Sequence, residues 1–129
     1  MEIDQETIIQ IQMMEHETNH LNEQLQIIEH NNREMSNLID SINEISKKET
    51  KEIMIDLGKR IFIPVDIKDK KLIVDVGKGN FVKKSTEDTK KSIEEEKNKL
   101  IENKNAILKR LNELQEDMQK IINEIESKN

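Results

Sequence analysis

His16, Glu17 and His20 form a His-Glu-x-x-His pattern, which places two imidazoles four positions apart on one face of a helix. In zinc proteases this pattern holds the metal through the histidines, and the glutamate acts as the general base. The surrounding sequence offers no obvious third ligand and no apolar cleft for a substrate. Because the helical register described below leaves both histidines facing solvent, we interpret the pattern as a chance match that binds Zn²⁺ or Ni²⁺ only incidentally.

A second candidate site is the segment 75–79, Asp-Val-Gly-Lys-Gly, which brings two glycines next to a lysine. It lacks the full spacing of a phosphate-binding loop and precedes a strand-like segment instead of a helix. We therefore interpret it as a tight turn. The chain also contains no cysteine, which excludes disulfides and thiolate metal sites. The sequence predicts no catalytic residue, no metal and no cofactor, so we expect a protein that is not an enzyme.

The composition excludes several classes of protein. Of the 129 residues, 33% are hydrophobic, 37% are charged and only 2% are aromatic, and the net charge is -6. So few apolar and aromatic residues argue against a deep substrate pocket, and an acidic chain argues against nucleic-acid binding. No apolar run approaches the length of a membrane span. The acidic N-terminus without an apolar stretch, together with the missing cysteines, favours a cytoplasmic protein.

Both ends of the chain are predicted to form long helices of a coiled coil. Residues 1–50 contain no Gly or Pro, and residues 85–129 begin with a hydroxyl N-cap, Ser85, followed by acidic residues. Each segment repeats its apolar residues at alternating spacings of three and four, which is typical of heptad a and d positions. The first seam comprises Ile11, Met14, Thr18, Leu21, Leu25, Ile28, Asn32, Met35, Ile39 and Ile42; the second comprises Ile93, Lys97, Leu100, Lys104, Ile107, Leu111, Leu114, Met118, Ile121 and Ile125.

Three polar residues interrupt these seams. Asn32 either fixes the register of the coiled coil or is a tolerated polar gap. Lys97 and Lys104 either extend their amino groups to solvent or specify the register.

The middle segment, residues 51–84, changes to the alternating pattern of β-strands. The sequence contains four short runs rich in β-branched and aromatic residues, separated by turn residues: 52–57, 60–67, 72–76 and 80–83. They predict two consecutive hairpins in a region of net positive charge. Pro64 is expected at an edge or a bulge, since it cannot donate a hydrogen bond to a ladder. The apolar hairpin residues are Ile53, Ile55, Leu57, Ile61, Phe62, Ile63, Val65, Leu72, Val74, Val76 and Phe81.

The order helix, two hairpins, helix predicts an α+β fold with a single domain, residues 1–129. The two helices match in length, so we expect them to form an antiparallel coiled coil that places Ile42 near Ile93 and Met14 near Ile121. Isolated hairpins have open edges and little core of their own. We therefore expect the hairpins to pair with hairpins of other subunits.

This arrangement resembles the prefoldin subunits, and specifically the α-type, because β-type subunits carry only one hairpin. The similarity extends to local strings: Ile55-Asp56-Leu57-Gly58, Phe62-Ile63-Pro64, Val74-Asp75-Val76-Gly77-Lys78-Gly79 and Lys83-Lys84-Ser85-Thr86-Glu87-Asp88. Asn80 and Thr89 depart from the residues that are common in the family. The resemblance implies a hexamer of two α and four β subunits, assembled through a β-barrel formed by their hairpins. It also implies that the coiled-coil tips hold unfolded polypeptide and pass it to a group II chaperonin without using a nucleotide.

The residues that would contact such a client are the apolar side chains near the tip, where the first helix begins and the last helix ends. Ile8, Ile9, Met13 and Ile122 lie outside the seam, and the adjoining seam residues are Ile11, Met14, Met118, Ile121 and Ile125. Acidic residues surround them: Glu2, Asp4, Glu6, Glu15, Glu17, Asp117, Glu124 and Glu126. We expect a preference for basic, apolar unfolded segments. The alternative is a coiled-coil scaffolding protein without general client binding.

Overall fold

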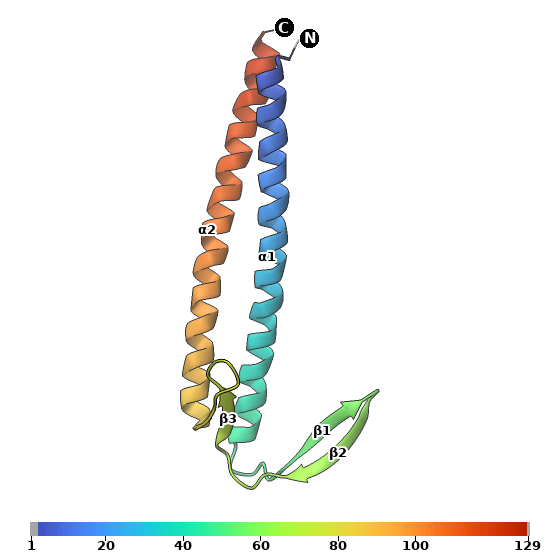
Figure 1. The fold of residues 1–129 in the computed structure, drawn as a ribbon, viewed down its shortest axis with the longest axis vertical. Coiled ribbons are helices and arrows are strands. Elements are labelled where there is room, and N and C mark those ends of the chain that lie inside the picture. Colours follow the sequence, from blue (N-terminus) through green and yellow to red (C-terminus); the bar gives the residue numbers. More distant parts are fainter. Residues whose placement is uncertain (1–2, 129) are drawn as a thin grey trace. The chain divides into compact units, whose positions relative to one another are not determined.

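The computed structural model describes residues 3–128, so Glu2, one of the acidic residues expected at the tip, lies outside the described part. Its elements are α1 (Gln5–Ser46), β1 (Glu52–Gly58), β2 (Ile61–Asp66), β3 (Leu72–Asp75), β4 (Phe81–Lys84) and α2 (Thr86–Ser127) (Figure 1). The predicted order of a helix, two hairpins and a helix is confirmed. The chain divides into two compact units, which we call the helical unit (residues 3–32 and 99–128) and the hairpin unit (residues 33–98).

Both helices begin at a side-chain cap. The carboxylate Oδ1 of Asp4 accepts a hydrogen bond of 2.8 Å from the backbone N–H of Thr7. The hydroxyl of Ser85 accepts one of 3.1 Å from the N–H of Asp88, as the sequence predicts. These bonds satisfy amide groups that the first turn of a helix leaves without partners. The hydrogen bonds from Thr7 also lower the pKa of Asp4.

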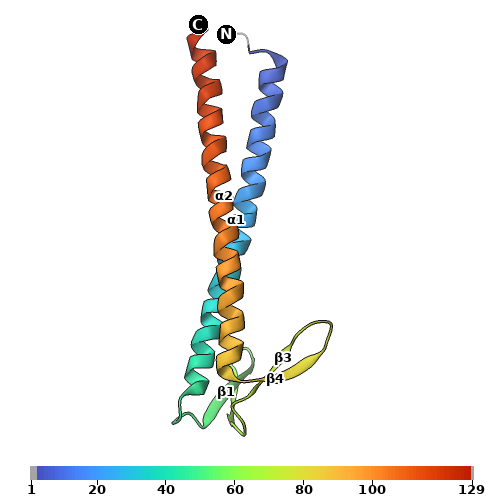
Figure 2. The same ribbon diagram turned by 90° about the vertical axis from the view of Figure 1, so that its left-hand side faces the viewer.

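In the helical unit the two helices run side by side in opposite directions (Figures 1 and 2). Every residue that the heptad pattern assigns to the seam of either helix is buried or half-buried. Leu114 and Ile121 are the most deeply buried apolar side chains of this unit. The predicted antiparallel coiled coil and the seam residues of both helices are therefore confirmed here, and the core is a single thin row of side chains.

The two lysines in the seam of α2 reach polar partners at its border. In the helical unit, the Lys104 amino nitrogen lies 3.9 Å from a Glu29 carboxylate oxygen. In the hairpin unit, the Lys97 amino group donates a hydrogen bond of 2.9 Å to the Ser36 hydroxyl. Both side chains are half-buried, so their aliphatic stems cover the seam while their charges reach its polar edge.

In the hairpin unit, one face of the β3–β4 hairpin is turned toward the helices. Leu72 and Val74 are half-buried and line a hollow of about 450 Å³ together with Ile42 and Ile93, while Ile73 between them is exposed. This alternation is the period-two pattern of a strand with one covered face. Ile42 and Ile93 are both buried, in agreement with the predicted pairing.

The β1–β2 hairpin turns through three consecutive residues with positive φ. Gly58, Lys59 and Arg60 have φ values of 115°, 52° and 64°, and β2 begins only at Ile61. The sequence placed Arg60 in the second strand, which is wrong, because a left-handed residue cannot continue a strand. Pro64 pairs with Met54 in a sheet of two strands, so it lies at an edge as predicted, and the irregularity lies between Asp56 and Gly58.

Replacing Lys59-Arg60 by Asn-Gly is expected to stabilise this hairpin by about 1 kcal/mol, because non-glycine residues with positive φ are strained and Asn-Gly favours the two-residue turn. Hydrogen exchange of the β1 and β2 amides should slow by roughly fivefold. As a control, Lys68→Gly changes a loop residue without positive φ and should leave exchange unchanged or faster. Equal or faster exchange in the Asn-Gly variant would contradict the strain at this turn.

Candidate functional site

The apolar residues predicted at the tip separate into two groups in the structure. Here the tip is the end of the helical unit where α1 begins and α2 ends. Ile8, Ile9, Met13 and Ile122 are exposed. The seam residues beside them are covered: Ile11, Met14, Met118 and Ile125 are half-buried and Ile121 is buried. Four of the nine candidates therefore present an open apolar surface, and the other five form the support beneath it.

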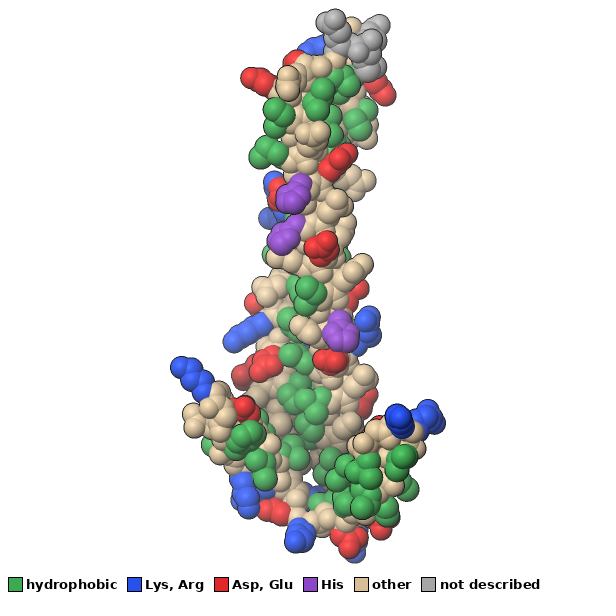
Figure 3. All heavy atoms as spheres, turned by 45° about the vertical axis from the view of Figure 1, so that its right-hand side comes forward, with side chains coloured by type: hydrophobic (Ala, Val, Ile, Leu, Met, Phe, Trp, Pro, Cys, Tyr) green, Lys and Arg blue, Asp and Glu red, His purple; other side chains and the backbone are tan. Residues whose placement is uncertain are grey.

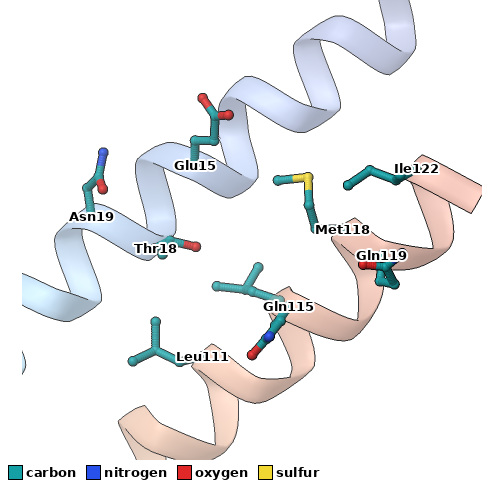
Figure 4. Close-up of a pocket in the computed structure, with 9 residues that line it drawn as sticks. Glu15, Thr18, Asn19, Leu111, Gln115, Met118, Gln119 and Ile122 are labelled. Carbon is teal, nitrogen blue, oxygen red and sulfur yellow. The ribbon is translucent and has the colours of Figure 1, made fainter.

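A hollow of about 510 Å³ opens between α1 and α2 near the tip. Met118 and Ile122 reach from α2 toward α1, and Glu15 and Thr18 contribute from α1 (Figure 4). A second, open depression of about 600 Å³ lies on the outside of α1, lined by Ile9, Met13 and their neighbours. Met13 is 68% exposed, and flexible methionine side chains adapt to partners of different shape. The tip thus offers shallow apolar surfaces and not an enclosed pocket.

The electrostatics of the helical unit are dominated by carboxylates. The sequence contains no lysine or arginine before Arg33, so the α1 part of the unit carries only acidic charges. Arg110 of α2 forms a close ion pair with this acidic surface. Its guanidinium donates hydrogen bonds of 2.7 and 3.0 Å to the two carboxylate oxygens of Glu17 and a weaker one of 3.4 Å to Glu113. This bidentate geometry is the strongest form of a charge-assisted pair.

The hydrogen bonds from Arg110 lower the pKa of Glu17. A carboxylate whose pKa is lowered in the folded state stabilises the fold above its ordinary pKa, and this contribution disappears as the pH falls through the lowered value. Glu17→Gln should therefore reduce the urea midpoint slightly at neutral pH, and the difference from wild type should vanish in strong acid. Both side chains are exposed, so the effect is small and decreases with added salt.

Urea unfolding at neutral and acidic pH, at low ionic strength, measures this contribution. The matched control is Glu23→Gln, since Glu23 forms no ion pair with any described residue of the chain. If Glu17→Gln and the control shift the midpoint equally at both pH values, Arg110 does not stabilise the fold through Glu17.

The His-Glu-x-x-His pattern is exposed on α1. The Nε2 atom of His20 lies 3.2 Å from the Gln24 amide nitrogen, and the carboxylate of Glu17, the candidate base, is held by Arg110. Within residues 3–128, no group of three His, Cys, Asp or Glu side chains converges on a possible metal position.

Several exposed apolar residues of the helices were missed by the sequence analysis. They are Ile27, Leu38, Ile101 and Leu108. The sequence does carry a signal for two of them, because Ile101 and Leu108 lie seven residues apart at heptad position e, in line with Ile122.

The hairpin residues predicted for assembly are largely uncovered. The exposed ones are Ile55, Leu57, Ile61, Phe62, Ile63, Val76 and Phe81; Ile53, Val65, Leu72 and Val74 are half-buried. Val76 follows the end of β3 instead of lying within it, and Met54, Ile73 and Val82 are further exposed apolar residues. Hydrophobic side chains gather on the hairpin surfaces in Figure 3. Each described sheet has only two strands, so both of its edges are unpaired.

Among the described residues, neither helix contains a stretch apolar enough to cross a membrane.

Comparison with known proteins gives a consistent result. The model of the prefoldin subunit family matches residues 14–129. Among solved structures, a chain from the cryo-EM structure of filamentous PFD from Methanocaldococcus jannaschii superimposes with a TM-score of 0.73 at 17% identity, covering 88% of this chain and 96% of that one. At this identity the likeness shows the fold alone. A search of curated proteins found no significant match. The family match extends over nearly the whole chain, and the protein therefore belongs to the prefoldin subunit family.

Proposed function

We propose that this protein is a subunit of an ATP-independent chaperone that holds unfolded polypeptide on its helical unit. Members of the prefoldin family are chaperones and not enzymes. The observation that carries the proposal is the group of exposed apolar side chains at the tip, Ile8, Ile9, Met13 and Ile122. An apolar surface that no part of its own chain covers is typical of an interaction site.

The two hairpins support assignment to the α-type and assembly through a β-barrel. Their unpaired edges and exposed apolar faces need partners. The partners we propose are β-type subunits, in a hexamer of two α and four β chains that passes its clients to a group II chaperonin in the cytoplasm. We regard residues 1–129 as one prefoldin-like domain. Because the M. jannaschii structure is described as filamentous, assembly of this chain with itself is the alternative. Native mass of the chain, alone and with a single-hairpin subunit, distinguishes the two.

The proposed function is tested by suppression of aggregation of a chemically denatured model protein, without nucleotide. Wild-type protein should suppress light scattering in proportion to its concentration. Ile9→Ser combined with Met13→Ser should remove most of this effect, since both side chains are exposed and their loss should leave the fold intact. The control is Leu38→Ser, which changes an apolar residue of the hairpin unit that is about as exposed as Ile9. A wild-type protein that never suppresses aggregation would favour the scaffolding role instead.

A further inference from the structure

The two sides of the coiled coil in the helical unit differ. On the side of the heptad g positions, Arg110 bridges α2 to Glu17 of α1. On the opposite side, the e positions of α2 are occupied by Ile101, Leu108, Gln115 and Ile122, and the three apolar members of this row are exposed. The e positions that face them on α1 include Glu15 and Glu29. We call this side the e groove.

The e groove is hollowed at two successive places. One is the hollow of about 510 Å³ near the tip, with Glu15 and Ile122 on its two borders (Figure 4). The other, of about 440 Å³, lies further along and is lined by Glu29 of α1 and by Ile101, Lys104 and Leu108 of α2. The seam residues form the floor of both. Apolar side chains on the α2 border therefore lie opposite a carboxylate of the α1 border at each of the two places.

The charges of the e groove favour a cationic occupant. Glu15 forms no ion pair with any described residue, and Glu29 has one long contact of 3.9 Å with Lys104. The α1 segment up to Asn32 contributes no lysine or arginine. A second copy of the chain docked on the same surface would bring another set of carboxylates close to these. Like charges that are brought together on closing an interface oppose association.

The row from Ile101 to Ile122 spans about 31 Å at the helical rise of roughly 1.5 Å per residue. An extended chain advances about 3.3 Å per residue, so roughly nine to ten of its residues match this length. Along the groove, such a segment would turn one set of alternate side chains toward α2 and the other set toward α1. This row is too long to serve a single anchoring side chain, and its shallow hollows suit a segment without fixed structure.

We propose that the e groove binds an extended, unfolded segment of roughly nine residues that carries both apolar side chains and Lys or Arg. This inference rests on the proposed chaperone function and names the class of client segment that it holds. Apolar client side chains contact Ile101, Leu108 and Ile122, and the cationic groups lie near Glu15 and Glu29. The binding surface therefore continues from the tip along the helices.

Titration of the full chain with fluorescent extended peptides tests the groove. The probes are a peptide of alternating Leu and Lys, one of alternating Leu and Glu, and one of alternating Ser and Lys. The Leu-Lys peptide should bind about tenfold more tightly than either of the others, which corresponds to one decade in Kd. If the Ser-Lys peptide binds equally well, the contact is electrostatic only, and the apolar groove is overturned.

The double variant Ile101→Ser, Leu108→Ser should weaken binding of the Leu-Lys peptide by about tenfold. Ile27→Ser is the matched control: Ile27 is 60% exposed, more than Ile101 at 43% or Leu108 at 42%, but it lies outside the e groove at position c. Glu15→Gln should weaken binding of the same peptide by about threefold, whereas Glu23→Gln should leave its Kd unchanged. Equal effects of the test and control variants would overturn the proposal.

Two further measurements distinguish a failure of the groove proposal from a failure of the proposed function. If wild-type protein and the Ile101, Leu108 double variant protect the client equally well in the aggregation assay, binding in the groove is refuted and the proposed function still stands. A wild-type protein that gives no protection refutes the function itself. The other possible occupant of the groove is a second copy of the chain, and sedimentation velocity of the double variant tests it. If the double variant forms a smaller assembly than wild type and Ile27→Ser do, a second copy occupies the groove and the proposal is overturned.

Discussion

Leu114→Ala is expected to lower the free energy of unfolding by about 2–4 kcal/mol. Leu114 is only 3% exposed and lies at a d position where the two helices of the helical unit meet. Its truncation removes buried apolar area and leaves a cavity that two continuous helices cannot easily close. Because the core is one residue thick, few other buried side chains compensate. Urea unfolding followed by far-ultraviolet circular dichroism measures the loss.

The control is Leu108→Ala, which makes the same chemical change six residues earlier on α2. Leu108 is exposed at an e position, so we expect a loss below about 1 kcal/mol. The pair separates stability from binding, since Leu114 supports the fold and Leu108 is proposed to contact client. Similar losses from both substitutions would show that the seam assigned here does not carry the stability of the coiled coil.

Asn32→Val is expected to stabilise the protein by about 1–3 kcal/mol. The Oδ1 atom of Asn32 is buried and accepts no hydrogen bond from any described residue, and a buried polar atom without a partner is costly. A β-branched residue at an a position also packs well in a coiled coil. Thermal and urea unfolding should both shift upward. The control is Asn37→Val at an exposed f position, where we expect a change within about 0.5 kcal/mol.

The same variant decides between the two interpretations of Asn32 that the sequence leaves open. If Asn32 specifies the register, Asn32→Val should be more stable and should also form additional species of different native mass. If Asn32 is a tolerated gap, the variant should gain stability and keep a single assembly. A variant that is less stable than wild type would mean that Asn32 has a polar partner in the assembled protein.

The sequence was sufficient for the order of the elements and for the residues of the seam. Heptad spacing is a local property, and the side of a helix that is apolar must be buried whatever the partner is. For the same reason the N-cap at Ser85 and the two hairpins were predictable. The strand boundary at Arg60 was not, because nothing in the residue type indicates a positive φ there.

The sequence likewise predicted an acidic tip with apolar residues outside the seam, and the structure places Ile8, Ile9, Met13 and Ile122 at the surface. It did not indicate on which side of the seam the exposed apolar surface continues from the tip along the helices. Positions e and g flank the seam symmetrically in a heptad pattern, and only the facing helix determines which of them is covered.

The pair of matched amphipathic helices and the two hairpins between them follow from the sequence, because those features depend on spacing within short segments. The three-dimensional packing was needed to show that Arg110 meets Glu17 on one side of the coiled coil, while Ile101 and Leu108 stay open on the other. The physical reason is that these residues lie far apart in sequence. Their contacts depend on how the side chains of the two facing helices pack against each other, which the spacing within one segment does not encode.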